Sequence, residues 1–249
     1  MHLTGLSGLP LVQPGDDVFP LIRRALEAAA VTLVDGDVLV VAQKIISKAE
    51  NRLVDLALVE PGERAIALAR EVDKDPRLVE LILRQSRGVV RHRPGVLIVE
   101  HVLGYVHANA GIDRSNVGAG DDVVLLLPED PDRSAAALRA RCGAELGADV
   151  AVIINDSAGR AWREGAVGFA LGTAGLEPVV SLIGRRDLMG RPLEVTTVAV
   201  ADELAAAASA LMGQSDEGVP VVVISGARWQ PGSAGSGSLI RAHAADLFR

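Results

Sequence analysis

The stretch Ala151–Glu164, which reads AVIINDSAGRAWRE, decides the fold and carries the first candidate chemistry. Its first four residues continue an apolar run that begins at Val150, and apolar and polar residues do not alternate in it. An unbroken run of this kind is typical of a strand buried on both faces of a sheet. The run is followed by a polar segment that contains Asn155, Asp156, Ser157, Gly159 and Arg160. Because α/β sheets usually hold ligands at the carboxyl ends of their strands, we examine this segment as a site.

A hard cation is the first ligand that this segment suits. Asp156 and Ser157 offer it oxygen ligands, and Gly159 allows close backbone approach. Arg160 could then face the anion that such a cation carries. The alternative is a strand-to-turn corner followed by a helix N-cap, because Asp and Ser favour both.

A second segment strengthens the first interpretation. It is His107–Gly118, HANAGIDRSNVG, and it contains the carboxylate of Asp113 and the polar groups of Ser115 and Asn116. Mg²⁺ is typically held by one or two carboxylates together with waters and substrate phosphates. Asp113 and Asp156 fit that arrangement if the fold brings them together. The alternative is an ordinary loop rich in Gly, Asn and Asp.

Composition limits the classes of function. The 249 residues suffice for one large domain or two modest lobes, and 49% of them are hydrophobic, but only 2% are aromatic. A net charge of −7 argues against a general nucleic-acid binder, which needs an excess of Lys and Arg. The single cysteine, Cys142, excludes an internal disulfide and a cysteine-rich metal site, and we expect it in the core. We find no signal peptide or long apolar span, so we expect a cytoplasmic protein.

Periodicity and caps predict a mixture of strands and helices. We predict strands at Val38–Ala42, Gly88–Arg93, Val96–His107, Asp121–Leu127, Ala151–Ile154, Ala166–Leu171, Glu177–Ile183, Leu193–Val200 and Val219–Ile224. We predict helices at Val18–Leu33, Pro61–Glu71, Asp75–Gln85, Asp132–Leu146 and Ala201–Met212. Two prolines make Leu3–Val12 and the residues after it a rigid loop rather than a central strand. Residues 231–249 are predicted to be a Gly/Ser linker with a short C-terminal tail.

The strand at Val38–Ala42 delivers Gln43, Lys44, Ser47 and Lys48 to its carboxyl end. Two lysines and a hydroxyl group after a strand suit phosphate binding, and a solvated helix start is the alternative. The sequence has no G-x-x-x-x-G-K-[ST] motif and no G-x-G-x-x-G motif after a strand, and these absences argue against a P-loop or Rossmann enzyme.

Several segments together resemble one family. In order along the chain they are Gly8-Leu9-Pro10, QKIISKAE at 43–50, ANAGIDRSNVG at 108–118, NDSAGRAWREG at 155–165, LGTAGLEPV at 171–179, the run at 185–208 and PVVVISG at 220–226. They resemble the coenzyme F-420:L-glutamate ligases, which complete a deazaflavin cofactor. The likeness covers nearly the whole chain, so we treat residues 1–249 as a single ligase domain that could have two lobes.

The resemblance implies an activity. Enzymes of this family use GTP and a divalent metal to join L-glutamate, one or more residues in γ-linkage, to a lactyl-linked carboxylate in coenzyme F-420 biosynthesis. The implied cofactors are Mg²⁺ or Mn²⁺, with two ions per site, GTP as co-substrate, and K⁺ as a further cation to test. The implied fold is a mixed α/β arrangement of two lobes in an intertwined homodimer, with no nucleic acid or membrane as partner.

The resemblance also implies roles for particular residues. Asp113 and Asp156 match metal-binding aspartates, and Ser157 matches a hydroxyl ligand of a second metal. The positions that match GTP contacts are Leu9, Pro10, Leu11, Val12, Gln43, Lys48 and Asn116. Lys48 and Arg160, with the metals on Asp113 and Asp156, would neutralise charge during phosphoryl transfer.

Three points stay open at this stage. A relative has Ser where this chain has Gln43, and the family often has Thr where this chain has Asn155. Glu100 and His107 are candidates for the base that accepts the proton of the amine. A metal-dependent nucleotide hydrolase and a non-catalytic nucleotide-binding module are the rival functions.

Overall fold

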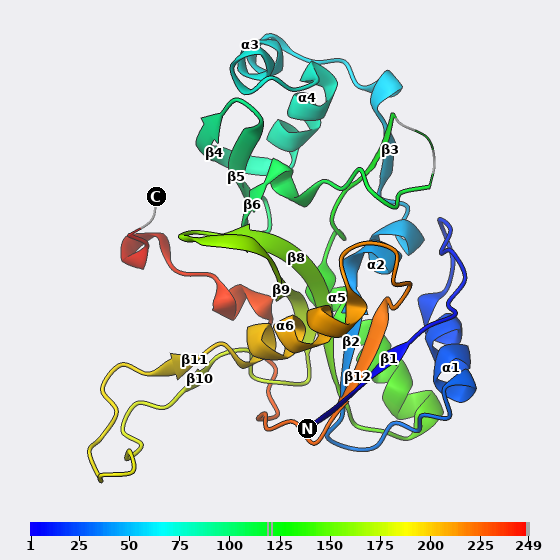
Figure 1. The fold of residues 1–249 in the computed structure, drawn as a ribbon, viewed down its shortest axis with the longest axis vertical. Helices are drawn as coiled ribbons and strands as arrows, with labels where there is room; N and C mark the ends of the chain where they lie inside the picture. Colours follow the sequence, from blue (N-terminus) through cyan, green and yellow to red (C-terminus); the bar gives the residue numbers. More distant parts are fainter. Residues whose placement is uncertain (119, 121, 248–249) are drawn as a thin grey trace.

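A five-stranded sheet forms the centre of the computed structural model, which describes residues 1–118, 120 and 122–247 (Figure 1). The strands follow the order β1-β12-β2-β8-β9. Their bounds are β1 His2–Leu6, β12 Val221–Ser225, β2 Val38–Ala42, β8 Ala151–Arg160 and β9 Arg163–Ala174. β2 and β8 are parallel, whereas the other neighbours are antiparallel. The architecture is therefore mixed α/β, as the sequence predicted.

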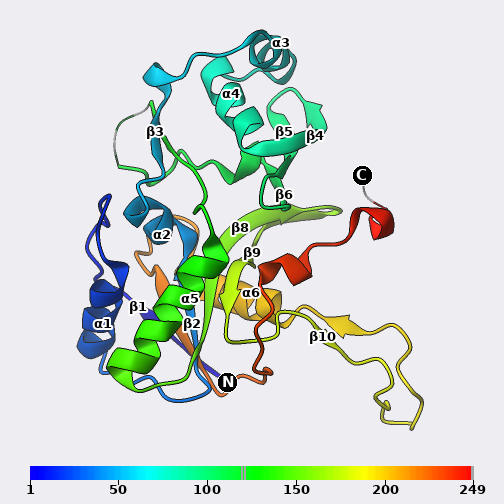
Figure 2. The same ribbon diagram turned by 180° about the vertical axis from the view of Figure 1, so that it is seen from behind.

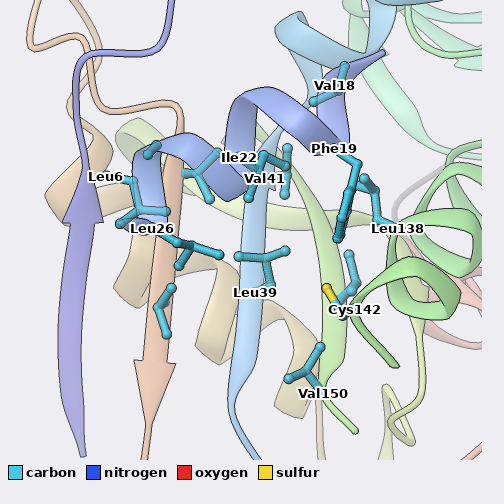
Figure 3. Close-up of a cluster of buried hydrophobic side chains, with 14 of the residues drawn as sticks. Leu6, Val18, Phe19, Ile22, Leu26, Leu39, Val41, Leu138, Cys142 and Val150 are labelled. Carbon is cyan, nitrogen blue, oxygen red and sulfur yellow. The ribbon is translucent and has the colours of Figure 1, made fainter. Parts of the chain in front are cut away.

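Helices cover both faces of this sheet. α1 (Val18–Ala28) and α5 (Pro131–Arg141) lie on one face, which Figure 2 shows from the front, and α6 (Val200–Met212) lies on the other. Successive residues of β2 point to opposite faces, so Leu39 and Val41 join the core under α1 and α5 while Val38 and Val40 join the core under α6. This explains why the strand sequences are apolar without alternation. Cys142 lies in the first of these cores, as predicted (Figure 3).

Residues 53–126 build a second unit with a core of its own. It contains α3 (Glu63–Val72) and α4 (Pro76–Arg84), packed on a three-stranded sheet, and a short two-stranded ladder. The strand bounds are β4 Ser86–Arg93, β5 Val96–His101, β6 Val106–Ala108, β3 Leu53–Asp55 and β7 Val123–Leu125. In Figure 1 this unit sits above the carboxyl ends of β2 and the buried half of β8. It therefore brings the segment after β6 to the edge of the central sheet.

Two peripheral segments complete the chain. β10 (Val180–Ser181) and β11 (Thr197–Val198) form the base of an arm that projects from the body in Figure 1. The Gly/Ser-rich segment predicted as a linker packs on the body, because Ser236 is buried and its backbone N–H donates to Asp132 Oδ1 at 3.0 Å. Ser236 also begins a 3₁₀ turn, Ser236–Leu239. Residues 248–249 of the predicted tail lie outside the described residues.

The largest error of the sequence analysis concerns β8 and β9. Asn155–Ser157 is not a turn, since β8 continues to Arg160 and pairs with β9 over this length. Gly172 lies in β9 beyond the predicted end of this strand at Leu171, whereas Gly168 lies within the predicted strand Ala166–Leu171. An added Cβ at Gly172 would lie 2.4 Å from Pro131 of α5, and one at Gly168 would lie 2.4 Å from Ser209 Cβ of α6. The two glycines allow helices to approach the strand closely, so they belong to its interior.

Smaller differences lie at the ends of elements. His2–Leu6 is a strand, placed at the sheet edge next to β12, and the predicted rigid loop begins after it. α1 ends at Ala28 instead of Leu33 because the chain turns at Ala30, whose φ is 52°. The predicted strand Val96–His107 is divided into β5 and β6 by a turn at Gly104, where φ is 95°. Asp121, the predicted start of another strand, lies outside the described residues.

Candidate functional site

The candidate site begins where β2 and β8 end their pairing. The last pair of the parallel ladder is Ala42 with Asn155, and the next residue on each strand is polar, Gln43 and Asp156. Gln43 also begins α2 (Gln43–Ala49), so β2 passes directly into a helix. Because parallel strands end at the same edge of the sheet, the first turn of α2 and the polar segment of β8 meet there.

Asp113 reaches this edge from the second unit. Its backbone is held by a two-way bridge to Leu125, with N–H to oxygen distances of 2.9 Å in both directions. Its carboxylate accepts a hydrogen bond from Gln43 Nε2 at 2.7 Å and forms an ion pair with Lys44 Nζ. Ser47 Oγ in turn donates to Gln43 Oε1 at 2.8 Å, which fixes the orientation of the amide. The first turn of α2 therefore orients the Asp113 carboxylate.

Lys48 lies one turn along the same helix. Its side chain is 9% exposed, and Nζ donates to the backbone carbonyl of Asn116 at 2.7 Å. Burial, with the nearby charge of Lys44, holds the pKa of Lys48 below its usual value. A buried ammonium group beside a second lysine creates a local positive field, which favours an anion at this position. The interpretation of Lys48 as a solvated helix residue is therefore wrong.

The loop between α6 and β12 is part of the same edge, although sequence reasoning did not identify it. Asn116 Nδ2 donates to the carbonyl of Ser215 at 3.0 Å. A strand antiparallel to β2 begins where β2 ends, so the loop before β12 necessarily lies at this edge. The signal that could have located it is the polar run GQSDEG between a helix and a buried strand.

Asp156 is the second carboxylate of the site, and its surroundings are less polar. Burial and the neighbouring Asp113 carboxylate raise the pKa of Asp156 to about 7. His107 Nε2 lies 3.9 Å from Asp156 Oδ2, and the imidazole packs against Phe169 with the ring centroids 5.1 Å apart. Burial lowers the pKa of His107 to about 4, so this histidine is neutral at pH 7 and does not compensate the carboxylate.

The donor set at this edge suits a hard divalent cation. Two carboxylates face the same region, and within the described ranges no lysine or arginine pairs with Asp156. His107 Nε2 is buried and has no hydrogen-bond partner among the described residues, which leaves another polar atom near Asp156. The described residues contain no preformed group of three or more His, Cys, Asp or Glu side chains for a metal. Asp113 and Asp156 would thus hold a cation jointly with water and substrate oxygens, as is usual for Mg²⁺.

Ser157 and Arg160 lie elsewhere on β8. Successive side chains of a strand alternate, so Ser157 points to the face opposite Asp156, where Asn155 contacts α6 through Met212 Sδ at 3.5 Å. Asp156 and Ser157 therefore do not face the same region. Arg160 is four residues beyond Asp156, roughly 13 Å along the strand at the usual rise, and its Nη1 donates to the Gly165 carbonyl at 3.2 Å. The structure does not bring Arg160 to the two aspartates.

The predicted nucleotide loop near the N-terminus lies beside α2. Val12 is 4% exposed and shares a core cluster with Ile46 of α2, whereas Leu11 is 81% exposed. Gly15 N–H donates to the Ala49 carbonyl at 2.9 Å, which ties the end of this loop to the end of the helix. Leu9 packs partly against the same cluster, and Pro10 is exposed. Pro10 and Leu11 are therefore the exposed residues of a turn that is otherwise packed beside α2.

The candidate base Glu100 lies outside this arrangement. It accepts from Arg87 Nη1 at 3.5 Å and lies 3.1 Å from His243 Nε2. His107 is thus the one of the two candidate bases that contacts a site carboxylate.

Among the helices of the described residues, none has the length and apolar character that a membrane span requires.

Comparison with known proteins identifies the family. The sequence pattern of the family described as F420-0:Gamma-glutamyl ligase matches residues 8–226. The protein called coenzyme F420:L-glutamate ligase in Methanothermobacter thermautotrophicus is 47% identical over 251 residues, which cover 100% of this chain and 99% of the relative. The protein of the same name in Methanopyrus kandleri is 45% identical, and the match covers 96% of this chain and 93% of the relative. The one in Methanocaldococcus jannaschii is 41% identical, and the match covers 100% of this chain and 97% of the relative. The chain belongs to the F420-0:gamma-glutamyl ligase family.

Proposed function

We propose that this protein is a GTP-dependent amide ligase that adds L-glutamate, in γ-linkage, to the lactyl carboxylate of the glutamate-free form of coenzyme F-420. The family and the names of its relatives support a ligase of coenzyme F-420 biosynthesis. The observation that carries the proposal is the meeting of Asp113 and Asp156 with Lys44 and Lys48 at one sheet edge. Carboxylates for a cation next to lysines for phosphate are the parts that phosphoryl transfer needs.

The chemistry requires activation of a carboxylate. A carboxylate is a poor acylating agent at neutral pH, so the γ-phosphoryl group of GTP is transferred to it first, and the amine of glutamate then displaces phosphate from the acyl phosphate. Mg²⁺ or Mn²⁺, held by Asp113 and Asp156 and, for a second ion, by Ser157, would neutralise charge on the phosphates. The remaining work of the protein is to position the reactants and supply positive charge.

Individual residues divide this work. Lys48, held by the Asn116 carbonyl, points its ammonium group at a fixed place in the phosphate region. Gln43 and Lys44 keep the Asp113 carboxylate in one orientation. The exposed turn Leu9–Val12 would contact the nucleoside. Of the two candidate bases, His107 is the one beside Asp156, and we propose it on this position alone as the group that accepts a proton from the incoming amine.

Phosphate release separates this function from its two rivals. GTP, metal, glutamate and the glutamate-free cofactor are supplied together and then with one omitted at a time. The ligase releases phosphate only when both acceptors are present. A nucleotide hydrolase releases it without them, and a binding module releases none.

Isotope transfer tests the acyl phosphate itself. If both carboxylate oxygens of the acceptor carry ¹⁸O, the mechanism predicts one ¹⁸O in each phosphate released, because the amine displaces the whole phosphorylated oxygen. Amide product accompanied by unlabelled phosphate would rule out the mechanism while leaving the ligase function intact.

We also propose that the protein works as a homodimer. The arm beyond β10 and β11 exposes Leu188 (101%), Met189 (84%) and Val195 (83%), which is unusual for a segment that stays in water. A second copy of the chain is the partner we propose for these side chains. Light scattering should give twice the chain mass for the parent, and Leu188→Glu with Met189→Glu should halve it. A monomeric parent would exclude this assembly.

A further inference from the structure

The tip of the β8–β9 hairpin, beyond Ser157, has no role in the chemistry proposed above. β2 pairs with β8 only as far as Asn155, so among the described strands none pairs with that edge of β8 beyond this residue. In both views the hairpin extends away from the central sheet, beneath the second unit and on the side where the C-terminal segment lies. Its outer half begins at Asp156, one of the two site carboxylates. A free strand edge therefore leads directly away from the site, and its unpaired backbone groups can donate to a ligand.

Trp162 occupies the tip of this hairpin in an unusual way. It is one of only two tryptophans in the chain, it is 86% exposed, and its φ is 66°. A bulky side chain in the left-handed region is a genuine outlier, and such strain is concentrated at functional sites. Arg160 Nη1 donates to the Gly165 carbonyl at 3.2 Å, which braces the turn. The tip of the hairpin thus carries a large and mostly exposed aromatic side chain.

The strip between Trp162 and Asp156 is small and flanked by positive charge. On the face of the strand that carries Asp156 it presents Ala158 and then Arg160, because successive side chains alternate; a Cβ added at Gly159, on the other face, would meet no atom within 4 Å. Arg160 and Arg163 stand on either side of the tip, and both are exposed. An elongated ligand could therefore lie along the strip, with an aromatic group at one end and an anionic group near the arginines.

We infer that this strip, from Asp156 to Trp162, is the docking site of the carboxylate-bearing acceptor, with its aromatic ring on Trp162 and its phosphodiester near Arg160 and Arg163. The inference rests on the proposed function, whose acceptor joins a deazaflavin ring through a phosphodiester-containing chain to a carboxylate. The acceptor carboxylate then reaches Asp156 and the phosphate region. The strip supplies the length and chemical order that this molecule needs.

The dimensions agree with this placement. Arg160 is the fourth residue beyond Asp156, which corresponds to roughly 13 Å along the strand, and Trp162 lies just beyond. A chain of about ten single bonds between a ring and a carboxylate spans roughly 12 Å when it is extended. One end of the acceptor can therefore stack on the tryptophan while the other end lies at the candidate metal site.

Tryptophan fluorescence provides a direct binding test without GTP. In a Trp229→Phe background Trp162 is the only tryptophan, and Trp229 is a suitable residue to replace because it packs on the body, with Nε1 donating to the Gly36 carbonyl at 2.9 Å. Titration with the glutamate-free cofactor should quench Trp162. In the otherwise native protein, Trp162→Ala should raise the acceptor KM roughly tenfold or more, as expected for loss of aromatic stacking. Trp162→Phe, which keeps a ring, should stay within about threefold of the parent.

Two controls separate docking from a structural role. Trp162→Ala should leave the Kd for GTP, kcat at saturating acceptor and the oligomeric mass unchanged. Arg163→Gln should raise the acceptor KM at low salt and make it less dependent on salt, because it removes a screened charge. An unchanged acceptor KM, equal losses in every parameter, or a changed mass would overturn the inference. If Trp162 is quenched but no amide forms, the proposed ligase function fails alone; if amide forms while Trp162→Ala is silent, only this inference fails.

Discussion

The two halves of β8 lie on one strand and serve opposite purposes. The inner half, Ala151–Ile154, is fully buried between α5 and α6 and carries only apolar side chains. The outer half, from Asp156 onward, lacks β2 beside it and carries a carboxylate, a hydroxyl and an arginine. The change occurs within one residue, at Asn155. A strand fixed along its inner half is a rigid support for chemistry on its outer half.

The largest effect is expected in the outer half. Asp156→Asn, or Asp113→Asn opposite it, removes an anionic oxygen while nearly preserving volume. Because a charge-neutralising metal contributes several kcal/mol to the transition state, ligation should fall about a thousandfold, equivalent to ~4 kcal/mol. Initial rates at limiting metal provide the measurement. Asp73→Asn is the matched control, since Asp73 caps α3 in a left-handed conformation that Asn tolerates. Normal turnover in both site variants would refute a shared metal site.

A substitution in the inner half of β8 should lower the stability of the fold rather than the affinity for GTP. Ile153 is fully buried under α6, so Ile153→Ala should reduce the free energy of unfolding by about 2–5 kcal/mol through lost burial and a residual cavity. Leu58→Ala, at an exposed position of the second unit, should change it by less than about 0.5 kcal/mol. Urea unfolding of the three proteins tests the contrast. The Kd of folded Ile153→Ala for GTP should match the parent, and a large change in that Kd would mean that the two halves are not separable.

Local signals in the sequence predicted most of the elements. The Asp17 and Asp75 carboxylates accept from Phe19 N and Arg77 N, as expected of N-caps, and the helices that they begin were found. The predicted strand ended too early, at Leu171, because glycine serves both in loops, as expected of Gly172, and in strands that helices approach closely. Which of the two applies depends on α5 and α6, and no local pattern records that.

The candidate site was less predictable than the fold. The sequence identified Asp113 and Asp156 as chemically suitable, but their proximity depends on how residues 53–126 pack above the central sheet. The ion pair between Lys44 and Asp113, the contact of His107 with Asp156 and the Asn116–Ser215 hydrogen bond all join segments distant in sequence. Arg160 shows the converse, since four residues of extended strand carry it away from a carboxylate that is near in sequence.

An intermediate effect, on the affinity for GTP, is expected from a substitution in α2, the helix next to the outer half of β8. Lys48→Met keeps most of the apolar stem and deletes the charge. GTP binding should weaken by roughly 1.5–3 kcal/mol, the range for a charge-assisted hydrogen bond. Lys74→Met, in the loop between α3 and α4, is the control for loss of a positive charge. Calorimetric titration of GTP into the three proteins tests this, and an equal Kd for the parent and Lys48→Met would exclude Lys48 from the nucleotide site.

The smallest expected effect concerns how the free energy of unfolding depends on pH. Ionisation of Asp156 and of His107 should change this free energy in opposite directions as the pH rises. The pKa of Asp156 is raised in the folded state to about 7, so its contribution is present at low pH and is lost as pH rises through 7. The pKa of His107 is lowered to about 4, so its contribution is present above the unfolded pKa of 6.5 and is lost as pH falls. Between about pH 5.5 and 7 the two contributions nearly cancel in the metal-free parent.

Asp156→Asn removes the contribution of Asp156 to this pH dependence and leaves that of His107. The variant should gain stability relative to the parent by about 1–2 kcal/mol as pH rises from about 5.5 to 7, because only the His107 contribution still changes. Urea unfolding in chelator at the two pH values measures the difference, and the other titrating groups cancel in the comparison. Asp73→Asn should instead run parallel to the parent. If the free energy of unfolding of Asp156→Asn changes with pH as that of the parent does, the Asp156 carboxylate ionises normally. In that case the outer half of β8 is as well solvated at Asp156 as at its tip.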